Sequence, residues 1–126
     1  MIKLSEEKVL YLHRIITAET GGDPGLRDTA LLNSALESAY LTFGGEELYP
    51  TVEQKCARIA FSLIANHAFV DGNKRIGMYV LLVFLEINGN TVRPTNEEVA
   101  RVGFAVASGE MKYGELLDWI LANEVK

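Results

Sequence analysis

Residues 67–77, His-Ala-Phe-Val-Asp-Gly-Asn-Lys-Arg-Ile-Gly, combine side chains that together could carry out chemistry. The imidazole of His67 is suited to accept a proton at neutral pH, because an unperturbed histidine is largely uncharged there. Asp71 provides a carboxylate for a divalent cation, while Lys74 and Arg75 provide cationic donors for phosphate. Taken alone, each of these residues is explained equally well as a helix cap or as part of a solvent-exposed turn. Their close spacing favours a site for phosphoryl transfer.

The helix that is expected to begin at this turn has an unusual charge at its start. The first backbone N–H groups of a helix lack partners within it and carry a partial positive charge, which favours anions. Three other expected helices begin with acids, at Glu6–Glu7, Glu53 and Glu97–Glu98. This helix begins instead with Lys74 and Arg75, each of which opposes the helix dipole by about 0.3 to 1 kcal/mol. A bound phosphate would reverse that penalty, so we expect a phosphate site here. The cationic donors at this site are Lys74 and Arg75.

The spacing of the apolar residues predicts an all-α fold, a compact bundle of about six helices with the active-site loop between two central helices. Ser5 is expected to cap the first helix, and capping boxes at Thr51–Gln54 and Thr95–Glu98 are expected to open two others. The apolar stripe of the third helix extends to His67, which would then line a groove. The expected helices cover about 5–19, 28–42, 73–88, 95–109 and 113–124, and a third helix opens at 51 and is separated from the next one by the turn at 71–73.

The composition is that of a globular protein, with 48% hydrophobic and 23% charged residues, and the 126 residues fit one domain, 1–126. The net charge of -5 argues against direct binding of nucleic acid or an anionic membrane surface, because both attract an excess of Lys and Arg. The chain begins without a signal-like apolar stretch, and no apolar run is long enough to span a bilayer. We therefore expect a cytoplasmic protein.

The pattern His-x-Phe-x-Asp-Gly-Asn-Lys-Arg at 67–75 resembles the signature of the Fic and Doc superfamily, and specifically its Doc, or death-on-curing, branch. The resemblance extends to residues 21–28, 31–36 and 44–50, so that it covers most of the chain. Fic enzymes, which transfer a nucleotide monophosphate to a protein hydroxyl, have a glycine at the position of Lys74 and an arginine at that of Met78. A lysine in place of glycine adds bulk and charge where backbone would approach a pyrophosphate, so a nucleotide should bind differently here.

The resemblance implies a Doc-like toxin of a toxin–antitoxin pair. Such a protein moves the γ-phosphate of ATP to a Ser or Thr hydroxyl of a translation elongation factor and so arrests translation. His67 would then be the general base, Asp71 would hold Mg²⁺, and Phe69 would support the loop from beneath. The residues that would clamp the phosphates are Gly72, Asn73, Lys74 and Arg75.

The resemblance also implies protein partners. A cognate antitoxin is expected to bind the groove with its C-terminal segment. An irregular connection is expected between the second and third helices. It resembles the family's flap, which positions a segment of the target protein beside the site. Its residues are Gly44, Gly45, Glu46, Glu47, Leu48 and Tyr49. Arg27 is similar to a family position near the groove, and His13 is interpreted as a structural residue of the first helix.

Three alternatives stay open on the sequence. The first is the Fic reaction, transfer of AMP to a protein. The second is a noncatalytic partner-binding module with the same fold, against which the intact His67, Asp71 and Arg75 weigh. The third, a metal-dependent hydrolase, is weaker because His67 and Asp71 supply at most two metal ligands.

Overall fold

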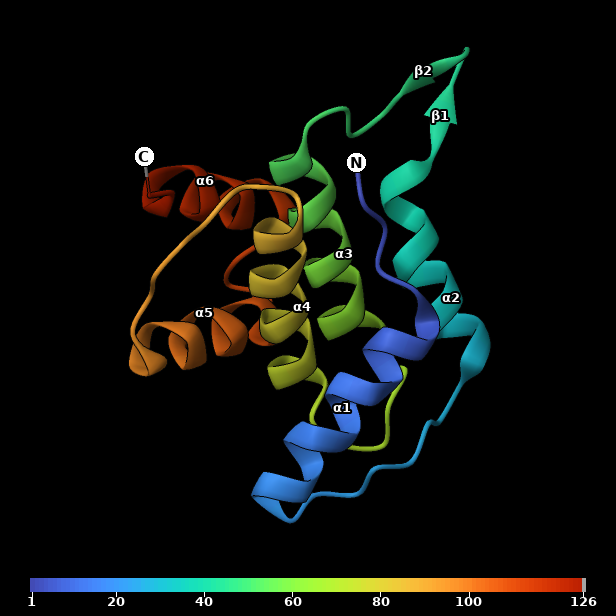
Figure 1. Ribbon diagram of the computed structural model, residues 1–126, viewed down its shortest axis with the longest axis vertical. Coiled ribbons are helices and arrows are strands. Elements are labelled where there is room, and N and C mark those ends of the chain that lie inside the picture. The colour runs from blue at the N-terminus through green and yellow to red at the C-terminus, as the bar shows by residue number, and fades with distance from the viewer. Residues whose placement is uncertain (126) are drawn as a thin grey trace.

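The computed structural model describes residues 1–125 and is built mainly from helices, which confirms the predicted all-α class (Figure 1). The described chain forms six α-helices and one short hairpin. The helices are α1 (Glu6–Thr20), α2 (Thr29–Glu37), α3 (Val52–Asn66), α4 (Asn73–Ile87), α5 (Asn96–Ser108) and α6 (Tyr113–Asn123). None of these helices is long and apolar enough to cross a membrane.

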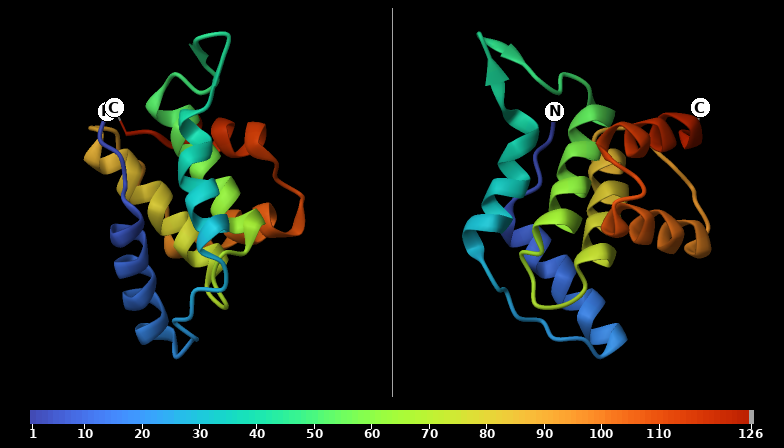
Figure 2. Two further views of the ribbon diagram at one scale, coloured as in Figure 1. Left: turned by 90° about the vertical axis from the view of Figure 1, so that its right-hand side faces the viewer. Right: turned by 180° about the vertical axis from the view of Figure 1, so that it is seen from behind.

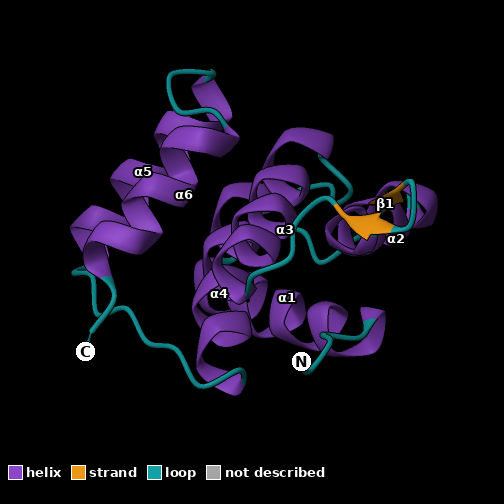
Figure 3. Cartoon of the chain, turned by 90° about the horizontal axis from the view of Figure 1, so that it is seen from above, coloured by secondary structure: helices purple, strands orange, loops and turns teal. Residues whose placement is uncertain are grey.

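Helices α3 and α4 form the centre of the molecule and are joined by the loop at 67–72 (Figures 1 and 3). Helix α3 packs against α2, α4, α5 and α6, and α4 packs against α1, α3 and α5. Every helix contributes fully buried apolar side chains to one cluster, among them Val9, Leu32, Leu63, Leu81, Val102 and Ile120. The predicted position of the active-site loop, between two central helices, is therefore confirmed. That residues 1–126 form a single domain stays a prediction.

The predicted helix starts are largely confirmed by side-chain caps. The Ser5 hydroxyl accepts a hydrogen bond from the Lys8 N–H at 3.1 Å, so α1 begins where expected. Thr51 and Gln54 form the predicted reciprocal capping box at the start of α3. At α5 only half of the predicted box exists, because Thr95 caps the Glu98 N–H while the Glu98 side chain points to other partners.

The second helix is shorter than predicted, and a hairpin replaces part of the expected irregular connection. Helix α2 ends at Glu37 rather than Thr42 and continues as one 3₁₀ turn, Ser38–Tyr40. Strands β1 (Thr42–Phe43) and β2 (Glu46–Glu47) then pair antiparallel across a two-glycine loop. Gly44 and Gly45 both have positive φ, 60° and 83°, as a tight hairpin turn of this length requires. The sequence signal for this hairpin is the Gly44–Gly45 pair between extended residues, and the sequence-based prediction missed it.

The buried lysine Lys55 fixes the base of this hairpin. Its ammonium group bonds the Glu47 carboxylate at 2.9 Å and also the Tyr49 carbonyl oxygen. Only 2% of Lys55 is exposed, so these partners compensate a charge that would otherwise be costly to bury. The hairpin lies near the N-terminal end of α3 and projects from the body of the molecule (Figures 1 and 2).

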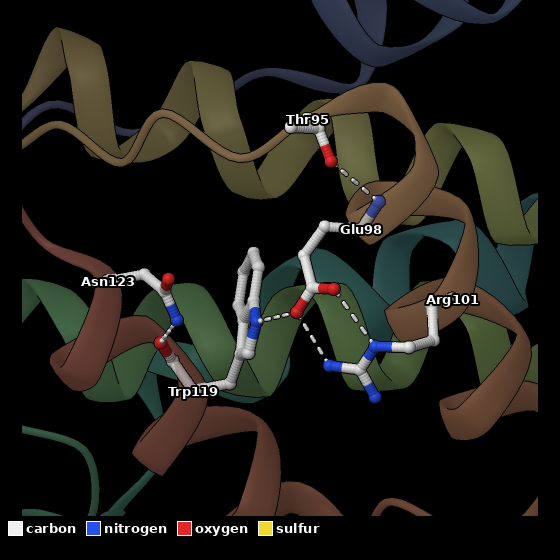
Figure 4. A network of polar contacts seen from close by, with 5 residues as sticks. All are labelled: Thr95, Glu98, Arg101, Trp119 and Asn123. Carbon is white, nitrogen blue, oxygen red and sulfur yellow. Dashed lines mark hydrogen bonds and ion pairs between the residues drawn. The ribbon is translucent and has the colours of Figure 1, made fainter.

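A polar network joins α5 to α6 through Glu98 (Figure 4). Arg101 donates to both Glu98 carboxylate oxygens, at 3.0 and 2.6 Å, and the Trp119 indole N–H donates at 3.0 Å. Asn123 in turn donates to the Trp119 carbonyl oxygen at 2.8 Å. The hydrogen bonds from Arg101, followed by that from Trp119, lower the pKa of Glu98 from 4.5 to about 2.

This network should make stability depend on pH in the acid range. Because the folded pKa of Glu98 lies below its unfolded value, its contribution is fully present above about pH 4.5 and is lost as pH falls towards 2. We expect the free energy of unfolding of the wild type to fall more steeply in this window than that of Glu98→Gln. Solvent screening of this partly exposed pair keeps the difference small. Urea titrations of both proteins at pH 5 and at pH 3 would measure the difference. An equal decrease in the free energy of unfolding between the two pH values would contradict the prediction.

Close packing of α3 on α4 depends on Gly77. A Cβ atom at this position would overlap Cγ1 of Ile64 and lie 3.2 Å from the Ala60 carbonyl oxygen. We expect Gly77→Ala to lower the free energy of unfolding by about 1 to 3 kcal/mol, because the two helices must separate. Gly114→Ala in α6 is the matched control, since nothing lies within 4 Å of its added Cβ. That control should gain about 0.5 to 1 kcal/mol from helix propensity. A neutral or stabilising Gly77→Ala would contradict the packing account.

Candidate active site

The loop between α3 and α4 lies beside the end of α1 and the segment 21–28 that follows α1 (Figure 1). Backbone hydrogen bonds connect this segment to the loop. The Val70 N–H donates to the Gly25 carbonyl at 3.0 Å, and Leu26 and Phe69 form an isolated antiparallel bridge. The loop is therefore held between two helix ends and an extended segment that is remote in sequence.

His13 and Phe69 support the loop from inside the molecule. Phe69 is 1% exposed and stacks on the His13 ring, with 3.8 Å between the ring centroids. The His13 Nε2 lies 2.7 Å from the Asp71 carbonyl oxygen, so this nitrogen must carry the proton. Phe69 thus lies beneath the loop, as its expected supporting role requires. The structural interpretation of His13 missed this partner, because the two residues are 58 positions apart and nothing in their local spacing links them.

Removing the His13 donor should destabilise the protein. We expect His13→Leu to lower the free energy of unfolding by about 1 to 3 kcal/mol, since the substitution leaves the Asp71 carbonyl oxygen without this donor. Chemical denaturation measures the effect. Arg14→Leu, an exposed neighbour on the same helix, is the control and should change stability by less than about 0.5 kcal/mol. Equal stability of the two variants would contradict the supporting role.

His67 ends α3 in a left-handed backbone conformation. Its φ and ψ are 52° and 51°, and it is the only described residue other than glycine with a positive φ. Such a conformation costs a histidine of order 1 kcal/mol, so the surrounding contacts must hold it. The side chain is exposed and lines two hollows, a pocket of about 400 Å³ and a groove of about 1260 Å³. The histidine therefore lines a groove as expected, at the boundary of two spaces.

The start of α4 has the free positive end that the sequence predicted. Gly72 is the N-cap residue with φ 78°, and no side chain caps the helix there. Its first turn contains no acid, whereas Lys74 and Arg75 are exposed and line the groove together with His67. Among the described helices, α1, α2, α3 and α5 all have a side-chain cap, and α6 has Glu115 in its first turn.

The side chain of Asn73 is committed to the loop. Its Oδ1 accepts from the Phe69 N–H at 3.1 Å, and its Nδ2 donates to the Phe69 carbonyl oxygen at 3.0 Å. These two bonds close the loop on itself and fix the first residue of α4. The amide nitrogen carries a second N–H, so these two bonds leave one side-chain donor of Asn73 for a phosphate at this site.

Asp71 lines the groove and provides one carboxylate for a cation. Its Oδ1 accepts from the Gly72 N–H at 2.9 Å, and its Oδ2 faces Gly22, where an added Cβ would lie only 2.8 Å away. Residues 1–125 contain no group of three His, Cys, Asp or Glu side chains placed to hold a metal. One carboxylate nevertheless fits Mg²⁺, which usually takes one or two carboxylates and completes its shell with phosphate oxygens and water.

The hairpin predicted as a flap is not brought to the site. Residues 44–49 lie at the start of α3 and His67 at its end, about 22 Å apart along 15 helical residues (Figure 2). None of residues 44–49 lines either hollow beside His67. The segment that does run along the loop is 21–28, whose Gly22 lines the groove and whose Arg27 lines the smaller pocket.

The groove continues from the loop across the ends of α1 and α4 to one face of α5. Lys74 lies over the ring of Phe104, with its Nζ 5.6 Å from the ring centroid. Phe104 is 62% exposed and Tyr79 42% exposed, and both line the groove. The groove thus has two cations near the loop, Lys74 and Arg75, and is partly apolar along α5.

Comparisons with known proteins show the family to which the chain belongs. Residues 3–85 match the Fic/DOC family. The chain is 40% identical over 84 residues to Toxin Doc of Mycolicibacterium smegmatis, a match that covers 63% of this chain and 65%, less than two thirds, of that protein. It is 26% identical over 118 residues to Protein kinase doc of Escherichia phage P1, which covers 94% of this chain and 92% of that protein. The family match spans more than half of the chain, which therefore belongs to the Fic/DOC family and, within it, to the Doc branch.

Proposed function

We propose that this protein is a toxin of the Doc type that transfers the γ-phosphate of ATP to a Ser or Thr hydroxyl of a translation elongation factor. The observation that carries the proposal is the shared groove. A base, His67, and an uncapped helix start with two cations line the same space. The similarity to a relative named Protein kinase doc over most of the chain supports phosphate transfer.

Each residue has a chemical role in this proposal. His67 would accept the proton of the target hydroxyl as its oxygen bonds to the γ-phosphorus. The bond from that phosphorus to the bridging oxygen would then break and release ADP. The Lys74 and Arg75 side chains and the free N–H groups of α4 would stabilise the charge on the phosphate oxygens. Mg²⁺ held by Asp71 would neutralise further phosphate charge when bound.

The position of Lys74 favours γ-phosphate transfer over AMP transfer. Its side chain occupies the groove beside Phe104, where a glycine would leave room for backbone to approach a pyrophosphate. A nucleotide that presents its terminal phosphate to the helix start avoids this crowding. AMP transfer by the same base is the alternative, and it predicts that a different phosphate of ATP stays on the target.

The protein partners belong to the same proposal. The part of the groove along α5 would receive the C-terminal segment of a cognate antitoxin in the cytoplasm, because apolar and cationic side chains line it together. The segment 21–28, rather than residues 44–49, would position the target beside His67, since it already pairs with the loop backbone.

A translation extract tests this function. Purified protein and ATP should stop protein synthesis, and mass spectrometry should find a phosphorylated Ser or Thr on an elongation factor. Arrest without any covalent change would instead support a noncatalytic module that sequesters a partner. A phosphorylated protein outside the elongation machinery would contradict the proposed target while leaving the chemistry in place.

A further inference from the structure

Three consecutive carbonyl groups at the end of α3 accept hydrogen bonds from one residue, Arg27. Its Nη2 donates to the Asn66 oxygen at 3.3 Å, its Nε to the His67 oxygen at 2.9 Å, and its backbone N–H to the Ala68 oxygen at 2.9 Å. The last carbonyls of a helix lack partners within it, and a guanidinium group with several donors in a rigid fork suits adjacent ones.

These contacts fix the backbone on both sides of His67. The Asn66 carbonyl belongs to the peptide plane before the His67 Cα, and the His67 carbonyl belongs to the plane after it. The orientation of these two planes determines φ and ψ at His67 and therefore the direction of its Cα–Cβ bond. Because φ is 52°, a conformation that histidine rarely adopts, the backbone would relax to a commoner one without such contacts.

The direction of the His67 side chain matters because the ring lies where the two hollows meet. Arg27 lines the smaller pocket with His67, while Lys74 and Arg75 line the larger groove. No hydrogen bond recorded within residues 1–125 goes to the His67 imidazole, so its position depends on its backbone. A rotation of that backbone would carry the ring away from the start of α4.

We infer that Arg27 is a positioning residue for the proposed transfer, which holds His67 in its left-handed conformation and so directs the imidazole at the reacting hydroxyl. This inference rests on the proposed function for its kinetic consequence, but its structural part does not. The role differs from phosphate binding, because the Nε and Nη2 donors of Arg27 are bound to backbone oxygens.

The test compares Arg27→Gln, Arg27→Lys and Arg93→Gln. Arg93 is an exposed arginine that lines neither hollow, so its substitution removes the same charge from elsewhere on the surface. We expect Arg27→Gln to lower kcat for transfer roughly 10- to 100-fold, the scale of a misplaced reacting group, with the Kd for ATP within about twofold of the wild type. Arg27→Lys keeps the charge and a single donor group, so its kcat should lie between those of Arg27→Gln and the wild type. If Arg27→Gln fails to fold, Arg27→Lys decides on the same criteria.

A double-substitution cycle separates positioning from other roles. In a His67→Asn background, Arg27→Gln should change the residual rate by less than about twofold, because a residue that acts only through His67 has nothing left to position. A full additional loss in that background, or a parallel loss of ATP affinity, would overturn the inference. So would a kcat within twofold of that of Arg93→Gln.

The structural part is measured without activity. The nuclear Overhauser effect between the amide and α protons of His67 reports the sign of its φ, because these two protons lie closer together at a positive φ than at a negative one. It should weaken in Arg27→Gln but not in Arg93→Gln. An unchanged effect would overturn the inference even for an active enzyme. If the wild type transfers no phosphate but the effect weakens as expected, the proposed function fails while the positioning contact stands.

Discussion

The His67→Asn variant is expected to lose about 10²- to 10⁴-fold of the rate of phosphate transfer, the usual contribution of a positioned general base. Asparagine is the sharper choice than alanine for this position. It tolerates the left-handed backbone that His67 adopts, so the variant should keep its fold and its loop. Single-turnover transfer to the target, with ATP binding measured separately, would show the loss in the chemical step.

ATP affinity distinguishes the general base from a binding role. Binding should change little in His67→Asn, because the groups assigned to the phosphates belong to the start of α4. A transfer rate within a few fold of the wild type would contradict the assignment of His67 as base. Growth inhibition that persists in cells with His67→Ala would lead to the same conclusion and favour sequestration of a partner.

The Arg75→Glu variant is expected to be more stable than the wild type and much weaker in binding ATP. Replacing a cation by an anion in the first turn of α4 removes an unfavourable interaction with the dipole and adds a favourable one, about 0.6 to 2 kcal/mol in total. Losing a charged donor to phosphate should cost about 1.5 to 3 kcal/mol, which is roughly a 10- to 150-fold loss of ATP affinity. Thermal unfolding and calorimetric titration measure the two effects.

The control for this prediction is Arg14→Glu. Arg14 is exposed near the middle of α1, where the dipole has little effect, so the same charge reversal should leave ATP affinity unchanged and stability within about 0.5 kcal/mol. Opposite changes in stability and affinity are the signature of a charge placed for a ligand. If Arg75→Glu destabilised the free protein, Arg75 would have a structural role instead.

Local signals were enough to predict most of the helices and the uncapped, cationic start of α4. The start of α3 is encoded by Thr51 and Gln54 within four residues, and the cations of α4 follow its N-cap glycine by two and three residues. Both are short-range features, which periodicity and capping rules describe well. The same rules failed at α2, because two glycines formed a tight hairpin where an irregular connection was expected.

The contacts that position the site could not be predicted, because they join residues that are remote in sequence. His13 meets Asp71 across 58 residues, and Arg27 meets His67 across 40. The direction in which the hairpin projects likewise depends on how α2 and α3 pack. This packing places residues 44–49 near the N-terminal end of α3, whereas His67 lies at its C-terminal end. Residue type and spacing therefore indicated what the loop could do but not which segment lies beside it.

The central claim, that His67 and the start of α4 move the terminal phosphate of ATP, is tested most directly with ATP labelled at one phosphate. Purified protein would be incubated with an elongation factor and ATP labelled at either the α or the γ position, with His67→Asn as the blank. The account predicts that the factor retains label from the γ position only, and that the blank retains none. Label retained from the α position would contradict the account and assign the protein to AMP transfer.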